Sequence, residues 1–392
     1  MIAPDSFKGG MTAKEAVKAM ARGIKRVYPD AEYVLVPMAD GGEGTVQSLV
    51  DATAGKLVTA KVHNLLNHLV DADYGLLGDG ETAVIEMAAA SGIQFINAKT
   101  ANPLVTTTYG TGELILNAIK RGAKKIIIGI GRSATVDGGA GMAQALGARL
   151  LKADGQPIGF GGGGALAELA QIDTSQVDPR IAKATIAIAS DVTNTLTGPK
   201  GAAPIFGPQK GATPEMVKIL DRNLHHYAEV ITRRTGQSVE KLAGAGAAGG
   251  LGAGLLVFTN AQMQHGVDLV IAPTKLKEKA ADADYVFTGE GGIDFQTKFG
   301  KTPYGVAKAC KSVAPKAPVI VLAGNIGRGG NSLYTTGAID AIFGTPAGAK
   351  SLKQALCDAP NDIAQTAENV ARLIRVSNYS KRALKNNLVL IS

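Results

Sequence analysis

Residues 33–45 read YVLVPMADGGEGT, an apolar run that ends in an acidic, glycine-rich loop. The apolar run predicts a β-strand, and the residues after the loop, up to about residue 54, predict a helix. The same order occurs once before, because the short apolar stretch 1–4 leads through a polar turn into an amphipathic stretch over 12–28. A strand, a glycine-containing loop and a helix in repeated order indicate a parallel α/β sheet.

The pattern changes in the middle of the chain and returns near its end. Residues 57–87 contain β-rich stretches on both sides of the turn at 78–80, which predicts antiparallel strands. From about residue 284, short apolar strands alternate again with helical stretches. We therefore expect an α/β protein with two domains. One is a Rossmann-like, doubly wound parallel sheet of residues 1–56 and 277–392, and the other is a mixed-sheet α/β domain, residues 57–276, inserted within it.

Composition excludes several classes of protein. The 392-residue chain has 50 glycines in short clusters at the ends of apolar runs, which indicates tight backbone sites rather than low complexity. Its net charge of +8 is spread along the sequence and aromatic residues make up only 5%, so no nucleic-acid partner is expected. No apolar run reaches the ~18 residues that a membrane span requires. The two cysteines are far apart, which suits a reducing cytoplasm.

Loops at expected strand ends carry the groups that phosphoryl transfer needs: amides and a lysine for phosphates, a carboxylate, and a group that positions the acceptor hydroxyl. In the first such loop, Ser6 and Lys8 lie where a strand opens into a helix. The lysine could face an anion bound at the helix N-terminus. An ordinary loop with a solvated lysine is the alternative.

The second loop is acidic and flexible. Asp40 and Glu43 flank Gly41 and Gly42, and glycine lets a ligand come close to the backbone. The two carboxylates could hold Mg²⁺ or a substrate hydroxyl. Capping of the next helix by Asp40 is a second role, compatible with the first.

The loop 129–141, GIGRSATVDGGAG, follows an expected strand and opens a helix, which is the context of a phosphate-binding loop. Its candidate ligand-binding side chains are those of Ser133, Thr135 and Asp137. It is not a Walker A loop, and its glycine spacing does not fit a dinucleotide fingerprint. Thr111, in a threonine-rich stretch before a helix, is a further candidate, with helix capping as its alternative.

Three charged residues lie at later strand ends and in a later loop. Asp191 ends a buried strand, from which a carboxylate could orient the acceptor hydroxyl as a general base or hold Mg²⁺. Lys210 lies in a glycine-flanked loop and could reach a phosphate or a substrate carboxylate, and a solvated turn lysine is an equal alternative. Glu290 is a candidate ligand of Mg²⁺ or of a ribose.

Taken in order, a set of motifs over the whole chain resembles the bacterial glycerate kinase family, the glycerate 2-kinase group. They are APDSFKG, ADGGEGT, YGTGELI, SATVDGGAGM, SDVTN, FGPQKGA, GAGAAGGLGAGL, TGEG and GKTPYGVA. The resemblance implies a two-domain α/β kinase that transfers the γ-phosphoryl group of ATP to D-glycerate and forms 2-phosphoglycerate, with ATP and Mg²⁺ as cofactors. We assign Asp191 and Lys8 catalytic roles on this hypothesis, and Lys210 binds an anion. We expect a cytoplasmic monomer or homodimer whose partner is a small-molecule substrate, with site residues of both domains lining one cleft.

Several loop positions depart from the family pattern, among them Val136, where the family has Asn or Thr, and Thr195, where it has Pro. Arg132 stands where the family has glycine, and Gly292 and Phe295 stand where it has arginine and glycine. Loss of an arginine removes a group that suits phosphate or carboxylate. These departures leave open a weakly active kinase for another hydroxy acid, or a regulator with the kinase fold that binds a ligand without turnover. A dinucleotide-dependent oxidoreductase is disfavoured because the fingerprint is absent.

Overall fold

The computed structural model describes residues 1–388. The chain divides into two compact units. Unit 1 comprises Met1–Asp40 and the described residues from Val270 onward, and unit 2 comprises Gly41–Leu269. Both combine helices with parallel strands, which confirms the expected α/β class. The units begin and end at other residues than the expected domains, whose limits stay a prediction.

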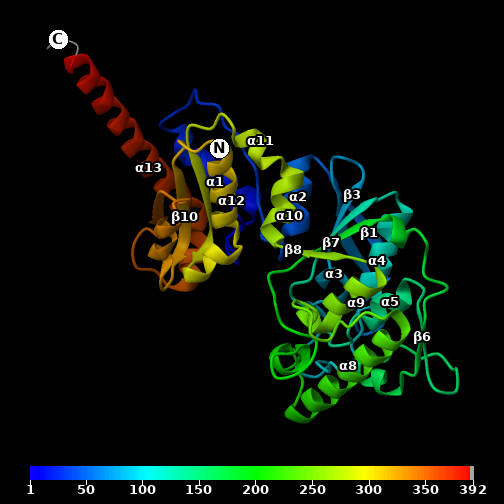
Figure 1. Ribbon diagram of the computed structural model, residues 1–392. Helices are drawn as coiled ribbons and strands as arrows, with labels where there is room; N and C mark the ends of the chain where they lie inside the picture. The colour runs from blue at the N-terminus through cyan, green and yellow to red at the C-terminus, as the bar shows by residue number, and fades with distance from the viewer. Residues whose placement is uncertain (389–392) are drawn as a thin grey trace. The chain divides into compact units, whose positions relative to one another are not determined.

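Unit 1 contains a parallel sheet in the order β11–β10–β9. Residues near the N-terminus extend this sheet, because Ile2 forms parallel bridges to both Phe287 and Leu35. The amide of Asp5 also donates to the carbonyl of Gly289, at 2.8 Å. The sheet therefore combines the N-terminal segment with strands from residues 286–344, far along the chain (Figure 1). The strands are β9 (Val286–Ile293), β10 (Val319–Ile326) and β11 (Ala341–Gly344).

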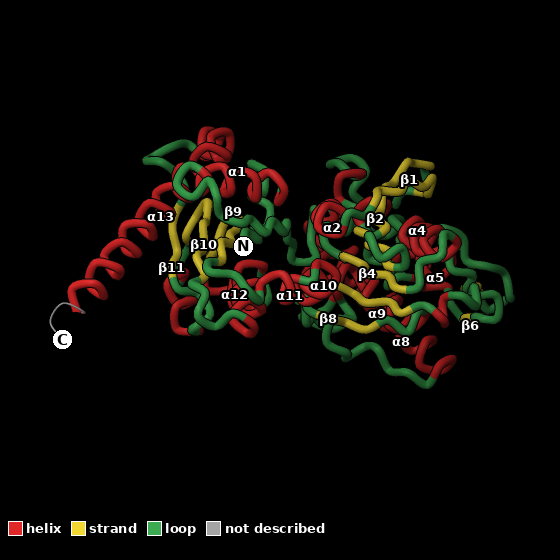
Figure 2. Tube along the Cα trace, turned by 90° about the horizontal axis from the view of Figure 1, so that it is seen from above, coloured by secondary structure: helices red, strands yellow, loops and turns green. Residues whose placement is uncertain are grey.

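Helices cover both faces of this sheet, as a doubly wound fold requires. Helix α1 (Ala13–Lys25) packs against α13 (Leu352–Leu388) on one face, and α12 (Thr302–Val313) lies on the other (Figure 2). The expected capping box is present, since Thr12 Oγ1 accepts from the Glu15 amide and Glu15 accepts from the Thr12 amide. The buried side chains of α1 recur at helical spacing and face the sheet.

Unit 2 contains a six-stranded mixed sheet in the order β1–β2–β3–β4–β7–β8. The pairs β1–β2 and β2–β3 are antiparallel, which confirms the expected change of pattern, and the pairs from β3 to β8 are parallel. The strands are β1 (Lys56–His63), β2 (Leu69–Leu76), β3 (Thr82–Glu86), β4 (Lys125–Gly129), β7 (Thr185–Ala189) and β8 (Gln262–Gln264). A separate antiparallel pair joins β5 (Arg149–Leu151) to β6 (Gln171–Asp173).

The helices of unit 2 pack on the sheet and on one another around two apolar clusters. Small residues allow the closest of these contacts: a Cβ atom on Gly254 of α9 would lie 2.8 Å from the carbonyl oxygen of Gly138. The helices are α2 (Thr45–Thr53), α3 (Ala88–Ser91), α4 (Tyr109–Lys120), α5 (Ala140–Ala145), α6 (Gly162–Ala165), α7 (Ala202–Phe206), α8 (Pro214–Thr235) and α9 (Leu251–Phe258). Helices α10 (Gly266–Thr274) and α11 (Leu276–Ala280) lead back into unit 1. None of the helices in residues 1–388 combines the length and the apolar character that crossing a membrane would take.

Candidate active site

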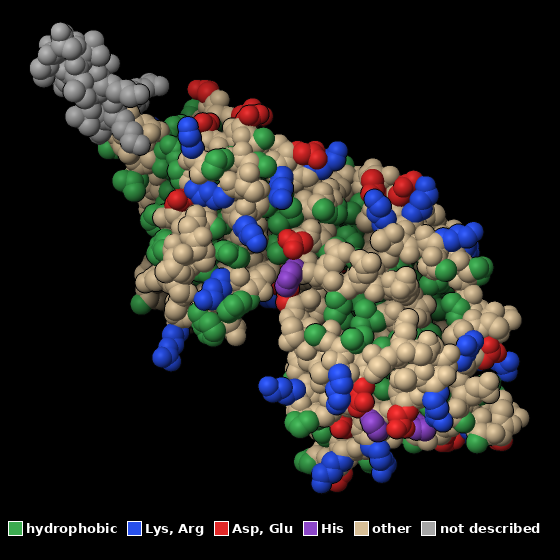
Figure 3. Space-filling view, viewed as in Figure 1, with side chains coloured by type: hydrophobic (Ala, Val, Ile, Leu, Met, Phe, Trp, Pro, Cys, Tyr) green, Lys and Arg blue, Asp and Glu red, His purple; other side chains and the backbone are tan. Residues whose placement is uncertain are grey.

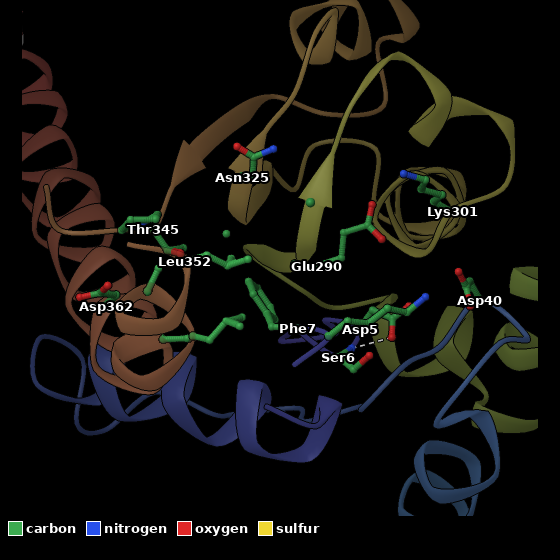
Figure 4. Close-up of a pocket in the computed structure, with 18 residues that line it drawn as sticks. Asp5, Ser6, Phe7, Asp40, Glu290, Lys301, Asn325, Thr345, Leu352 and Asp362 are labelled. Carbon is green, nitrogen blue, oxygen red and sulfur yellow. Dashed lines mark hydrogen bonds between the residues drawn. The ribbon is translucent and has the colours of Figure 1, made fainter. Parts of the chain in front are cut away.

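A pocket of about 370 Å³ lies in unit 1 at the carboxyl ends of its parallel strands. Ligands of doubly wound sheets bind at this edge. The structure brings four of the predicted site residues together here (Figure 4): Ser6, Lys8, Asp40 and Glu290. They come from three separate stretches of sequence, which the sheet places side by side.

Asp5 forms the buried floor of the polar side of the pocket. Its carboxylate accepts hydrogen bonds from the Thr302 hydroxyl and the Ser6 amide, both at 2.5 Å. Burial, and then the neighbouring charge of Asp40, raise the pKa of Asp5 to about 6. Because Thr302 is the first residue of α12, its bond to Asp5 attaches the N-terminal loop to that helix.

Glu290 has one buried carboxyl oxygen without a hydrogen-bond partner among the described residues. The side chain is about nine-tenths buried, and Oε1 has no hydrogen-bond partner among the described residues. Burial raises the pKa of Glu290 to about 8; Asp5 and Asp40 add to the shift, and Lys301 and Lys8 oppose it. A buried polar atom without a partner is rare in native proteins and is a candidate ligand contact.

Lys301 is a pocket residue that the sequence reasoning missed. It is the N-cap residue of α12, and Figure 4 shows its side chain on the same side of the pocket as Glu290 and Asp40. Its Nζ atom lies 3.4 Å from Asp294 Oδ1. The motif GKTPYGVA carried the signal, since it places a lysine at the start of an expected helix.

The loop from Asp40 to Glu43 precedes α2, but Asp40 is not the residue that caps this helix. Asp40 does not cap the following helix, because α2 begins at Thr45 with Gly44 at its N-cap. Glu86 serves this end of α2 instead: its carboxylate accepts from the Val46 amide at 3.0 Å. The capping role predicted for Asp40 is therefore wrong.

Gly41 and Glu43 belong to unit 2, where they lie near the end of its sheet. Gly41 has a φ of 88°, and a Cβ atom there would lie 2.7 Å from the Cβ of Ala189 at the end of β7. Glu43 forms an ion pair with Arg132, and both line a second pocket of about 380 Å³. Arg132 has a φ of 57°, which is in the left-handed region that favours glycine. Gly42 lies between Gly41 and Glu43 in the sequence of this loop.

Lys210 lies inside unit 2, with 1% of its surface exposed. Its Nζ atom donates to the Ser133 hydroxyl at 2.7 Å and to the Thr135 carbonyl at 2.8 Å. Burial lowers the pKa of Lys210 to about 7, although the charge of Asp137 opposes this shift. The alternative of a solvated turn lysine is wrong, because the side chain joins two loops in the interior.

Asp137 completes this buried network. Its carboxylate accepts from the Thr108 amide and hydroxyl, both at 2.8 Å, and from the amides of Gly139 and Gly141. Burial raises the pKa of Asp137 while these bonds oppose the shift. Thr111 is buried as well, with its hydroxyl 2.8 Å from that of Ser91. The structure thus brings the predicted residues of loop 129–141 together with Lys210, and their role towards a ligand stays a prediction.

Asp191 follows β7, and a histidine from the end of β8 lies beside it. Nδ1 of His265 is 2.7 Å from Asp191 Oδ1, and both side chains reach solvent. A carboxylate holds the ring and tautomer of an imidazole in this geometry. Sequence reasoning missed His265, because no spacing pattern connects it to a residue 74 positions earlier.

Comparisons with known proteins agree over nearly the full length. Residues 1–375 match the model of the glycerate kinase family. A glycerate kinase of Halalkalibacterium halodurans is 52% identical over 97% of this chain and 98% of its own length. The glycerate 2-kinase of Escherichia coli is 47% identical over 96% of this chain and 98% of its own length. A crystal structure of glycerate kinase 2 from Salmonella typhimurium LT2 superposes with a TM-score of 0.88 at 47% identity, covering 96% of this chain and 98% of the other.

Proposed function

The chain belongs to the glycerate kinase family and is an enzyme of the kinase class, and on that premise we propose that it phosphorylates D-glycerate at the 2-position. ATP is the phosphoryl donor that this family implies. The choice of the 2-position is supported by the relative named glycerate 2-kinase, which this chain matches over 98% of that protein's length. The products are then 2-phosphoglycerate and ADP.

The unit 1 pocket is the observation that carries this proposal. It combines two lysines with three carboxylates at the carboxyl edge of a parallel sheet: Lys8, Lys301, Asp5, Asp40 and Glu290. Lysine ammonium groups bind phosphate oxygens as point charges, and acids at the same place can hold a cation. Phosphoryl transfer depends on this type of positioning and charge neutralisation rather than on covalent chemistry of the protein.

The donor atoms fit Mg²⁺. This ion prefers oxygen ligands and is typically held by one or two carboxylates, with water and substrate phosphates completing its shell. Glu290 offers a buried carboxyl oxygen without a partner, and Asp40 lines the same pocket. Among the described side chains no group of three or more His, Cys, Asp or Glu could hold a metal ion. Bound Mg²⁺ would neutralise phosphate charge.

Several residues act directly in the proposed reaction. Lys8 binds phosphate oxygens and offsets the charge that develops during transfer. Asp191 orients the acceptor hydroxyl and receives its proton, and His265 keeps the carboxylate in position through the 2.7 Å contact. The predicted ligand contacts of the buried network stay part of this proposal: Ser133, Thr135, Asp137, Lys210 and Thr111.

We further propose that the enzyme acts in the cytoplasm, as a monomer or homodimer, on small molecules and without nucleic acid. The two cysteines are free, which suits a reducing compartment. Figure 3 shows Lys and Arg side chains scattered over the face in view among acidic ones, whereas nucleic-acid binding proteins gather them in a patch.

Product identification tests the proposal. The protein is incubated with ATP, D-glycerate and Mg²⁺, and ³¹P NMR follows the new phosphate ester while a coupled assay follows ADP. We expect a 2-phosphate that requires Mg²⁺. A 3-phosphate contradicts the proposed position. Thermal stabilisation by glycerate or ATP with no turnover contradicts the kinase proposal and favours the ligand-binding regulator.

A further inference from the structure

The unit 1 pocket has two chemically different ends. Figure 4 shows Glu290, Lys301 and Asp40 on one side, and Leu352, Thr345 and Asp362 on the other. The second side is walled by apolar side chains of the first N-terminal loop and the start of α13: Phe7, Leu352, Ala355, Leu356 and Ala359. Most of the charged groups therefore lie at the first end, and Asp362, the charged residue at the second end, is already paired with Lys350 at 2.8 Å.

The apolar end does not suit glycerate. A three-carbon acid with two hydroxyl groups has almost no apolar surface, so it gains nothing from such a wall, whereas a heterocyclic base gains ~25 cal/mol for each Å² that it buries. The pocket volume of about 370 Å³ also falls in the range of roughly 300–1,000 Å³ typical of larger ligands. Asn325 and Thr345 add the few polar groups that orient a ligand in such pockets.

Glycine keeps the pocket open on the side of β9. A Cβ atom on Gly292 would meet no heavy atom closer than the Asn325 carbonyl oxygen, at 4.0 Å. Gly292 lines the pocket, so a side chain at this position could take up space there without a close contact between its Cβ atom and the protein. The opposite wall offers a similar position, because Ala355 of α13 lines the pocket and is only half-buried.

We propose that this pocket binds the nucleoside part of ATP at its apolar end, with the phosphates directed towards Lys8, Lys301 and Glu290. This inference rests on the proposed function and assigns the pocket to the nucleotide rather than to the hydroxy acid. Glu290 Oε1, the buried oxygen without a partner, then faces the phosphates and their cation. Ala355 limits the space for the base, and Gly292, two residues from Glu290 on the same face of β9, limits the space beside the phosphates.

Two filling variants test the assignment from opposite walls. Ala355→Trp and Gly292→Leu should each raise the KM for ATP at least ~tenfold and change the KM for glycerate less than ~twofold. Lys353→Trp is the matched control, since it adds the same bulk on the exposed side of α13 outside the pocket. Thermal unfolding verifies that each variant is folded. An unchanged KM for ATP in both folded variants, or a raised KM for glycerate, would overturn the assignment.

Direct binding separates this inference from the proposed activity. In calorimetric titrations, ADP should bind the wild-type protein and Lys353→Trp with similar affinity. Its affinity for each of the two filling variants should be lower by ~tenfold or more. This result supports the pocket assignment even if the protein turns over no glycerate, in which case only the proposed function fails. Equal ADP affinity in all four proteins overturns the assignment even where glycerate kinase activity is present.

Discussion

The Nζ atom of Lys210 lies 2.7 Å from the hydroxyl oxygen of Ser133, in a part of unit 2 that solvent does not reach. A lysine in such a place is costly to charge, because burial removes the hydration of the ammonium group. The two bonds that it donates, to Ser133 and to the Thr135 carbonyl, tie loop 129–141 to the short helical turn Pro208–Lys210. Lys210 therefore shapes the loop whatever it does towards a ligand.

The first prediction concerns the pH dependence that Lys210 creates. Its pKa is about 7 in the folded protein and 10.5 in the unfolded chain, so between these values the unfolded chain binds the additional proton. Stability should therefore rise with pH from about 7 to 10.5, by up to roughly 3–5 kcal/mol from this group. Lys210→Met should lack this rise. Calorimetric unfolding of both proteins between pH 7 and 10 measures the difference.

Lys200→Met is the control for this experiment, because Lys200 is exposed on a loop of the same unit. Its pH profile should follow that of the wild-type protein. Parallel profiles for Lys210→Met and the wild type would show that Lys210 is charged when folded, and would contradict the prediction.

The second prediction concerns Glu290, which should make the stability of the protein fall with rising pH, whereas Lys210 makes it rise. Its pKa is raised from 4.5 to about 8 on folding, so in this interval the folded state binds the additional proton. The contribution to stability is complete below pH 4.5 and is lost as the pH rises to about 8, by up to roughly 3–5 kcal/mol. Glu290→Gln should remove this loss, and calorimetric unfolding of the ligand-free proteins between pH 5 and 8.5 tests it.

The exposed Glu278 provides the comparison within unit 1. Glu278→Gln should retain the wild-type loss of stability with rising pH. If Glu290→Gln retains it too, another group causes the loss and the burial argument for Glu290 is wrong.

The third prediction concerns Asp191. If this carboxylate receives the proton of the acceptor hydroxyl, Asp191→Asn should lower kcat by roughly 10²–10⁴-fold while the affinity for ATP stays near that of the wild type. His265→Gln should lower kcat less than Asp191→Asn does, because His265 acts through Asp191. Steady-state kinetics from pH 5.5 to 9 measure both effects.

Asp154→Asn, at an exposed turn of unit 2, should leave kcat and the pH profile unchanged. A wild-type kcat in Asp191→Asn would remove Asp191 from the reaction. A change in the affinity for ATP with unchanged kcat would assign it to binding instead.

Local patterns in the sequence predicted much of the fold. The apolar period of α1 and the pair Thr12 and Glu15 depend on neighbours within a few residues, so their structure could be read directly. The environment of Lys210 could not, because its two partners lie 77 and 75 positions away and only folding removes the water around it. Its loop position alone therefore suggested a solvated side chain as readily as a ligand contact.

The candidate site was predicted in part for the same reason. Ser6, Lys8 and Asp40 follow extended segments of one parallel sheet, Glu290 lies in the carboxyl half of β9, and the ends of such strands meet at one edge. Lys301 does not follow a strand, and it joins the pocket because α12 packs beside β9. That packing is set by contacts over the whole unit, which periodicity does not specify.

The final prediction concerns the backbone at Arg132. A residue other than glycine in the left-handed region costs roughly 1–2 kcal/mol, and an exposed ion pair such as that with Glu43 contributes only about 0–1 kcal/mol. Arg132→Gly removes both terms, so its stability should stay within about 1 kcal/mol of the wild type. Arg132→Ala removes the ion pair but keeps the backbone cost, so it should be less stable than the glycine variant by about 1 kcal/mol.

The order of the two variants is what distinguishes backbone strain from side-chain contacts. Lys218→Gly and Lys218→Ala, at an exposed position inside α8, are the controls. Here the alanine variant should be the more stable one, because alanine stabilises a helix by about 1 kcal/mol relative to glycine. Calorimetric unfolding of the four variants measures both comparisons. An alanine variant at 132 as stable as the glycine variant would mean that the loop relaxes to a negative φ, and that the positive φ of Arg132 is not imposed by its surroundings.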